Sequence, residues 1–407
     1  MTTLIPASAP ADIPESTGDP IAIPGPWTFW ADNSVSPYAP IGQVAVTSFT
    51  CNWALNGFGA GEAVIPVETS LGNSMGRLDL LRFFGFRLWA YYAGSVVWAG
   101  LATGLADDGG SAVTVSLVEL PGYLNYKQYA TTQVYNNVEQ TTIAGDLAAR
   151  LDNIGVPRIL TPGAGRTRQR TYTYLQGQSR GELLTQLCQV TNGAEFRSEY
   201  GLDANSRPTC SLHIAYPRVG SNASGLALVV PGGAVSFQSN WASDMMRTRT
   251  FAVGDLAPGA SGNKPVVIVT ASQPGIPEID HVDDWQGVTD NTTLNERANT
   301  NSAIYASPAF TVSAVVPVNG PPLGSYAIGD DVAVALADPL VPSGYTAMGR
   351  LVGASADAAA GTVSWEVAIT QPPPVKRGLV NELNRLRARV VNAMHQNLGT
   401  PPGGTNP

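Results

Sequence analysis

Two stretches of this chain, residues 27–124 and 231–370, consist of short apolar segments separated by turn residues. The segments 85–91 and 113–118 alternate apolar and polar side chains with a period of two, which is typical of a β-strand with one buried face. A run of Asp and Gly at 107–110 is a turn signal between such segments. Several short strands joined by tight turns predict a small, closed or nearly closed β-barrel.

Residues 125–230, between the two strand-rich stretches, carry helical patterns as well as strands. The segment 137–151 has mostly helical apolar spacing. Ser179 followed by Glu182 has the spacing of a capping box before a second helix. A hairpin is predicted over 195–216. This stretch is therefore predicted to be a small α+β domain.

The two strand-rich stretches resemble each other. Gly100 matches Gly349, and Gly104 matches Gly353, while the run TVSL at 114–117 matches TVSW at 362–365. A glycine inside a strand permits a bulge or a close approach at a barrel corner. The match predicts a duplicated barrel, although two Gly- and Val-rich hairpins can also align by chance. With two similar barrels in one chain, three chains present six barrels around one axis.

Composition limits the classes of partner. Charged residues make up 13% of the chain and the net charge is -8, which argues against general nucleic-acid binding. Gly (43) and Pro (31) are abundant, which suits β-structure with many turns. A surface so poor in charge fits one that neighbouring subunits cover. A GC-rich coding sequence, which enriches Ala and Gly, is the alternative explanation.

The N-terminal sequence, the apolar runs and the cysteines exclude several kinds of segment and site. Residues 1–26 contain no Lys or Arg and many prolines, so we expect an extended arm and no signal peptide. No run of 18 apolar residues occurs, so no membrane span is predicted. The three cysteines Cys51, Cys188 and Cys210 lie far apart and predict neither a disulfide framework nor a zinc site.

Aromatic residues supply the first candidate interface. Trp27, Phe29 and Trp30 follow the arm, and Trp89 and Tyr91 lie on a strand that is apolar on both faces. Such a strand is either central between two layers or part of an interface. Trp and Tyr are favoured as interface anchors, so we expect some of these residues at a subunit contact.

The C-terminal segment supplies the second candidate interface. Leu379, Leu383, Leu386 and Val390 are spaced as a heptad seam within the helical segment 375–398. The seam predicts a three-helix bundle on the axis of the assembly or a helix that docks another protein. The alternative is an amphipathic helix packed on its own barrel.

A search for catalytic and metal-binding patterns finds no GxSxG, HExxH or Walker-type motif. Asp280, Asp283 and Asp284 beside His281 suit Ca²⁺ by residue type, yet their spacing is also that of a polar surface turn. The expectation is therefore no catalytic residue, no cofactor and no metal.

Three glutamates are candidates for a pair of glycosidase carboxylates. Glu182 is better explained as a helix-capping residue, and Glu195 and Glu199 face alike on a hairpin. The chain is accordingly predicted not to be an enzyme.

Two motifs carry a resemblance to a known family. One is LWAYYAGSVVWAGL at 88–101, followed by 113–123, and the other is YTYLQGQSRGELLTQL at 172–187 with GAEFR at 193–197 and YPRVG at 216–220. Over residues 40–370 the chain resembles the tail hub proteins (tail-associated baseplate hubs) of long-tailed phages, particularly the minor tail proteins of actinobacteriophages.

The resemblance implies a homotrimer at the tail tip of the virion. Its two barrels would form a pseudo-six-fold ring, with the α+β domain outside, enclosing the channel for genome delivery. The partners implied are the distal tail ring or tail tube protein, the tape-measure protein and other minor tail proteins, with DNA only in transit. No lytic domain is expected after the second barrel.

The fold class expected is mainly β, with two related β-barrel domains, a small α+β domain between them and a C-terminal helix. The expected organisation is a Pro-rich arm (1–26), a first barrel (27–124), an α+β insert (125–230), a second barrel (231–370), and a helix with a Pro/Gly tail (371–407). The function expected is a structural tail-tip hub. A receptor- or carbohydrate-binding tail-tip adhesin and a cell-wall hydrolase are the alternatives.

Overall fold

The computed structural model of the chain describes most of residues 23–369. The ranges within those bounds that it does not describe are 24, 34–39, 67–83, 108–111, 164–165, 175–176, 191, 223, 231, 243–245, 257–260, 272–276, 286–287, 306–308 and 338–343. The expected C-terminal helix, with Leu379, Leu383, Leu386 and Val390, and almost all of the expected arm lie outside the described residues.

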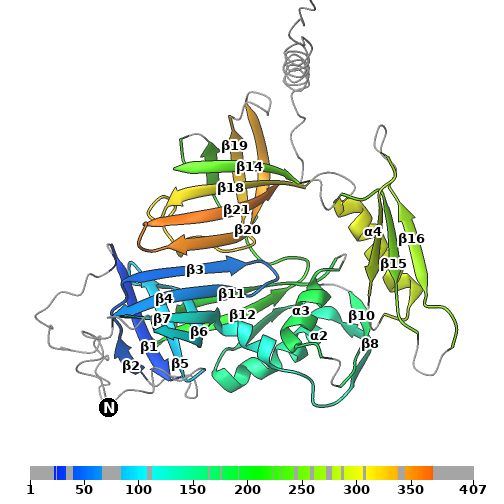
Figure 1. Ribbon diagram of the computed structural model, residues 1–407, viewed down its shortest axis with the longest axis horizontal. Helices are drawn as coiled ribbons and strands as arrows, with labels where there is room; N and C mark the ends of the chain where they lie inside the picture. The colour runs from blue at the N-terminus through cyan, green and yellow to red at the C-terminus, as the bar shows by residue number, and fades with distance from the viewer. Residues whose placement is uncertain are drawn as a thin grey trace, which may run out of the picture.

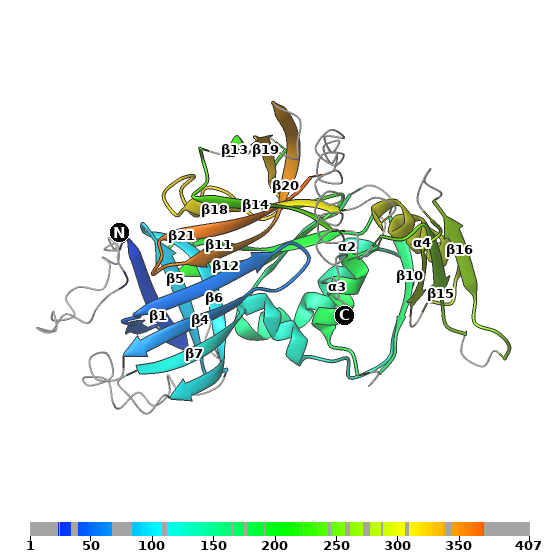
Figure 2. The same ribbon diagram turned by 45° about the horizontal axis from the view of Figure 1, so that its top comes forward.

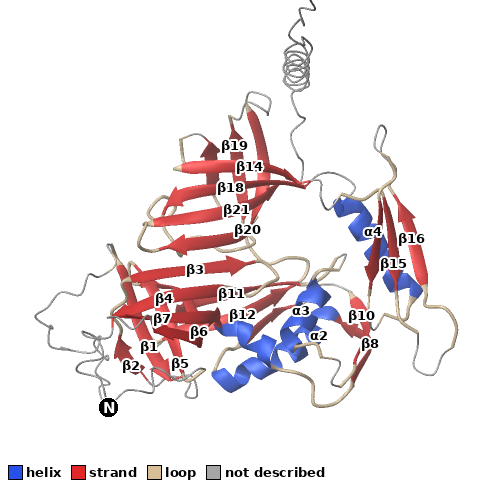
Figure 3. Cartoon of the chain, viewed as in Figure 1, coloured by secondary structure: helices blue, strands red, loops and turns tan. Residues whose placement is uncertain are grey.

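A single curled sheet of 13 strands dominates the fold (Figures 1 and 3). Its first half runs in the spatial order β3-β4-β7-β6-β5-β1-β2. The bounds of these strands are β1 Trp27–Asn33, β2 Pro40–Gln43, β3 Ser48–Ala54, β4 Ala60–Pro66, β5 Phe86–Tyr92, β6 Ser95–Asp107 and β7 Ala112–Glu119. The expected mainly β fold with small helical parts is confirmed.

The second half of the sheet runs in the order β14-β18-β21-β20-β19-β13. Its strands are β13 Leu226–Val230, β14 Ser236–Ala242, β18 Ala309–Pro317, β19 Asp331–Leu336, β20 Tyr345–Asp357 and β21 Thr362–Ile369. The second part of β20 pairs antiparallel with β3, from Gly353 opposite Ala54 to Asp357 opposite Thr50. This ladder joins the two halves edge to edge into one sheet.

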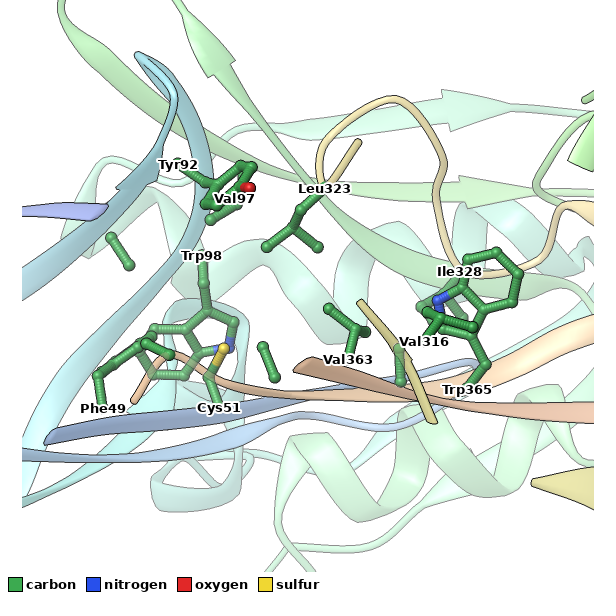
Figure 4. Close-up of a cluster of buried hydrophobic side chains, with 14 of the residues drawn as sticks. Phe49, Cys51, Tyr92, Val97, Trp98, Val316, Leu323, Ile328, Val363 and Trp365 are labelled. Carbon is green, nitrogen blue, oxygen red and sulfur yellow. The ribbon is translucent and has the colours of Figure 1, made fainter. Parts of the chain in front are cut away.

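One hydrophobic core serves both halves. Phe49, Trp98 and Leu88 from the first half share it with Val312 and Trp365 from the second, and all five are almost fully buried. Figure 4 shows part of this cluster, with side chains from both halves. The alternating burial of each strand, such as buried Phe49 and Cys51 beside exposed Thr50, follows from the period of two.

The α+β insert follows β7 and packs on the other face of β5 and β6 through a second core. It contains η2 Leu120–Tyr126, β8 Gln133–Glu139, α2 Gln140–Leu147, η3 Ala148–Ile154, β9 Arg158–Thr161, β10 Thr167–Tyr172, α3 Arg180–Cys188, β11 Glu195–Leu202 and β12 Pro208–Ala215. The predicted hairpin is β11 and β12, and Ser179 and Glu182 form the predicted capping box of α3. Figure 2 shows α2 and α3 beside β11 and β12.

The predicted start of the first insert helix at residue 137 is wrong. Residues 137–139 belong to β8, and the helix begins at Gln140. The carboxylate of Glu139 accepts hydrogen bonds from the backbone N–H groups of Thr141 and Thr142, so it caps the helix at this point. The apolar spacing had included Val138, which packs from the strand.

A further small unit interrupts the second half of the sheet between β14 and β18. It contains β15 Arg249–Val253, β16 Val266–Thr270, β17 Asp280–Asp284 and α4 Asn291–Tyr305. The unit has its own small core around Ala252, Leu294 and Ala298, and the sequence patterns did not distinguish it.

Candidate functional surface: the open face and edges of the sheet

The two halves of the sheet repeat each other in register. Gly100 lies opposite Leu88 in the β5–β6 ladder, and Gly349 lies opposite Val332 in the β19–β20 ladder. The register then shifts just before Gly104 in β6 and just before Gly353 in β20. The predicted matches of Gly100 with Gly349 and of Gly104 with Gly353 are therefore confirmed by equivalent positions in two ladders.

The third strand of the repeat needs a correction. Leu105 and Ala354 follow the two matched glycines, and they pair with Val115 and Trp365 respectively. Val115 is thus the structural counterpart of Trp365. The shared TVS run aligns Leu117 with Trp365 instead, which is two residues from Val115. The strand pairing that decides the match is not visible in the sequence.

A stronger repeat links β3 and β14. β3 reads SFTCNWA and β14 reads SFQSNWA, so five of the seven positions are identical. β3 pairs with β4 and β14 pairs with β18, and these partner strands pair in turn with the equivalent strands β7 and β21. This repeat is readable in the sequence, but it lies outside the hairpins whose glycines and TVS runs predicted the duplication.

The face of the sheet opposite the core is polar, and seven of its strands carry no cation. None of the strands β3, β4, β6, β7, β14, β18 and β21 contains Lys or Arg. Three carboxylates lie on this open face, from Glu62, Asp357 and Glu366. Arg350, in the first part of β20, lies on the same face as Ala368 of β21 and binds Glu195 of the insert. The neutral polar side chains of the open face are Thr50, Asn52, Ser116, Gln238, Asn240, Ser313, Ser355 and Ser364.

The open face is hollowed where the two halves meet. A shallow depression of about 410 Å³ lies over the β3–β20 ladder, with Asn52, Glu62, Ser355, Asp357 and Ser364 among its lining residues. It is wide and open, whereas small ligands usually bind in enclosed pockets.

Four sheet edges lack a strand partner in the part of the chain that the structure describes: the outer edges of β2, β13 and β14, and the second part of β6. Two of them are related by the repeat. One is the outer edge of β14, which stands at the end of the sheet. The other is the second part of β6, beyond Ala102. The ladder with β5 ends at Leu101 and the N–H of Phe84 still donates to the carbonyl of Ala102, whereas the ladder with β7 continues to Asp107. Uncovered edges present unpaired N–H and C=O groups and favour pairing with another chain.

The aromatic residues expected at an interface pack against the cores of the chain itself, and three of the five are buried there. Trp27 and Phe29 belong to the core of the sheet, and Trp89 belongs to the core between sheet and insert. Trp30 and Tyr91 are half-buried and pack against that second core. β5 is therefore apolar on both faces because it lies between two cores, which was the alternative explanation.

The acidic residues that suit Ca²⁺ by residue type form ion pairs with Arg and Lys side chains. Asp283 forms an ion pair with Arg247 at 2.9 Å, and Asp280 forms one with Arg249. Lys264 approaches Asp284 at 3.8 Å. These pairs give each β17 carboxylate a structural partner.

The glutamates considered as candidate glycosidase carboxylates also have structural partners. Glu182 serves the capping box of α3, and Glu195 binds Arg350, with one oxygen 2.6 Å from Nη1. Glu199 accepts from Arg197 at 2.7 Å and contacts Nδ1 of His213 at 2.8 Å. Each carboxylate thus has its own cationic or backbone partner, and they do not converge on a shared cleft.

The three cysteines are buried and unpaired with one another. Burial raises the pKa of the Cys51, Cys188 and Cys210 thiols, so they stay protonated and unreactive at neutral pH. Among the described helices, none has the length and apolar character needed to cross a bilayer.

Comparison with known proteins gives a likeness in structure only. No family model matches the chain, and no curated protein matches its sequence. The 43 kDa tail protein of prophage MuSo2 from Shewanella oneidensis is similar, with a TM-score of 0.55 and 15% identity over 85% of this chain and 98% of that one.

A tail protein from Neisseria meningitidis MC58 gives a TM-score of 0.55 at 14% identity, covering 86% of this chain and 97% of that one. A chain of the lidded Francisella PdpA-VgrG complex gives 0.51 at 8% identity, covering 86% and 54%. The resemblance predicted from the sequence motifs is confirmed at the level of the fold: the chain has the fold of the phage tail proteins.

Proposed function

We propose that this protein is a structural subunit of a phage tail tip, which assembles as a trimer with pseudo-six-fold symmetry around a channel. The observation that carries the proposal is the repeated half-sheet, in which β3-β4-β7-β6-β5 and β14-β18-β21-β20-β19 follow the same spatial order. Two equivalent halves in each chain allow three chains to present six equivalent units, which suits contact with a six-fold tail tube.

The open face supports a role as the channel wall. It carries the carboxylates of Glu62, Asp357 and Glu366, and the seven strands named above contain no Lys or Arg. Arg350 of β20, on the same face, is neutralised by Glu195 of the insert. Binding to DNA depends on cations that neutralise phosphates. A channel wall of hydroxyl, amide and carboxylate groups would therefore let DNA or the tape-measure protein pass without binding either tightly.

The assignment to the tail rests on the fold shared with the two tail proteins. In this proposal the ring contacts the distal tail ring or tail tube protein on one side and other minor tail proteins on the other. Its place is the tail tip of the virion, where the genome leaves the particle.

Labelling of virions tests the assignment. Gold-labelled antibody against this chain should bind purified virions at the distal end of the tail, and the mass of the purified protein in solution should be three times 42.5 kDa. Label along the capsid, or absence from the virion, would overturn the tail-tip role. A monomer that binds host glycans would support the adhesin instead, and lysis of host cell wall would support a hydrolase.

A further inference from the structure

The junction between the two halves of the chain has a defined register. In the β3–β20 ladder, the N–H of Leu55 donates to the carbonyl of Val352 at 2.9 Å, and the N–H of Ala358 donates to the carbonyl of Phe49 at 3.0 Å. Hydrogen-bonded and non-hydrogen-bonded pairs alternate along an antiparallel ladder. Asn52 and Ser355, which lie opposite each other between these points, are therefore a non-hydrogen-bonded pair.

The chain contains a second copy of each strand in this junction. β14 repeats the sequence and the position of β3, so Asn240 is the counterpart of Asn52. The second part of β6 repeats that of β20, since Gly104 is the counterpart of Gly353, so Ala106 is the counterpart of Ser355. Both copies lie at sheet edges without a strand partner among the described residues.

Within one chain these two edges are not paired with each other. β14 stands at the far end of the path of the sheet from β6, with β18, β21, β20, β3, β4 and β7 between them. A second copy of the chain can supply the missing partner for each edge.

We propose that β14 of one copy pairs antiparallel with the second part of β6 of the next copy, with Asn240 opposite Ala106. The inference rests on the proposed ring and specifies how it closes. The register of the β3–β20 ladder then places Gly104 opposite Ala242. Three such junctions between chains alternate with three β3–β20 junctions within chains, which gives six equivalent joints around the axis.

Burial along the two copies agrees with a missing neighbour. Phe49 in β3, which has strands on both sides, is 0% exposed, whereas its counterpart Phe237 in β14 is half-buried. Ala106 and Asn240 are both exposed in the single chain. Pairing of the two edges would cover this region as β20 covers β3.

A disulfide across the proposed junction tests the register. The Cα atoms of a non-hydrogen-bonded antiparallel pair lie about 4.5 Å apart, which a disulfide can bridge. The variant carrying Ala106→Cys and Asn240→Cys should form covalent dimers and closed trimers under oxidising conditions, running as monomer after reduction. The native cysteines are buried, so the background from them is low.

The control variant combines Ala106→Cys with Gln238→Cys. Gln238 is exposed on the same face of β14, two residues from Asn240, and diagonal positions lie about 7–8 Å apart, beyond the usual reach of a disulfide. Cross-linking should be several-fold weaker than for the matched pair. Equal cross-linking in both variants would overturn the proposed register.

The outcomes separate this inference from the proposed function. A trimer by mass, in which the matched pair does not cross-link, contradicts the β14–β6 junction while leaving the ring standing. A monomer by mass contradicts both. As a second readout, Asn240→Lys with Ala106→Lys should weaken the trimer through like charges directly opposed, and Asn240→Lys with Ala106→Glu should restore it.

Discussion

Arg87 and Asp32 form a bidentate ion pair inside the protein, with Nε 2.6 Å from Oδ1 and Nη2 2.7 Å from Oδ2. Both side chains are only 2% exposed. Nη1 of Arg87 also donates to the carbonyl of Ile154 in η3 at 2.9 Å. The pair therefore fixes β1 and β5 of the sheet to the insert. Burial raises the pKa of the Asp32 carboxyl, although Arg87 opposes this effect.

Loss of Arg87 should be costly for this reason. Arg87→Met leaves the Asp32 carboxylate buried without its cation, and breaking a buried pair from one side costs about 3–5 kcal/mol. Urea unfolding should show a loss of that size in the free energy of unfolding. The double variant Arg87→Met with Asp32→Leu should recover much of it, and a single variant that loses less than about 1 kcal/mol would contradict the account.

Glu119 predicts a pH dependence of stability. Its carboxylate is buried and accepts from the N–H of Gly59 at 2.7 Å and from the hydroxyl of Tyr200. Burial raises the pKa of Glu119 above its ordinary value, against the effect of these hydrogen bonds. Between the pKa of Glu119 in the unfolded chain and its higher pKa in the folded protein, the folded protein keeps a proton that the unfolded chain has released. The free energy of unfolding therefore falls as pH rises through this range.

Glu119→Gln isolates that effect. Glutamine resembles the protonated side chain, so wild type and variant should be similarly stable below the unfolded pKa of about 4.3. At pH 7 the variant should gain on the wild type by about 1.4 kcal/mol for each pKa unit of the rise. Urea titrations at the two pH values measure it, and a difference independent of pH would count against the buried carboxyl.

Gly100 is required for close packing. A Cβ atom added at Gly100 would overlap the indole ring of Trp98, whereas one at Gly104 would lie 3.2 Å from Cβ of Ser116. Gly100→Ala should therefore lower stability by about 1–3 kcal/mol through overpacking, and Gly104→Ala should lower it less. Thermal unfolding of the two variants side by side checks the order, and equal effects would be inconsistent with the packing described.

The open face predicts how the ring responds to added cations. Replacing Glu62, Asp357 and Glu366 by Lys changes the charge of the chain by +6, from -8 to -2. The trimer should then retain double-stranded DNA at low salt and release it as salt rises, because phosphate contacts are screened. The wild type and a variant with Gln, Asn and Gln at these positions should not retain DNA. If the neutral variant retained as much DNA as the Lys variant, the charge of this face would not control DNA binding, which would contradict the account.

Local patterns predicted the elements better than their connections. Period-two alternation indicated strands such as β5 and β7, and the Ser179–Glu182 spacing predicted the start of α3, because both signals lie within a few residues. The β3–β20 ladder joins residues about 300 positions apart, and no local period encodes such a pairing. Alternation also could not tell an interface strand from β5, which lies between two cores.

The candidate surface shows the same limit. The matched glycines at 100 and 349 indicated a duplication, but the open face emerged only once pairing placed Glu62, Ser355 and Glu366 on one side. The repeat of β3 in β14 was readable in the sequence and is the signal that would have located the edges.

Electron microscopy of the purified protein tests the central claim most directly. Class averages viewed down the axis should show a ring of three chains with six similar lobes around an open centre. Single protomers, or closed particles without six-fold features and without a central opening, would contradict the account.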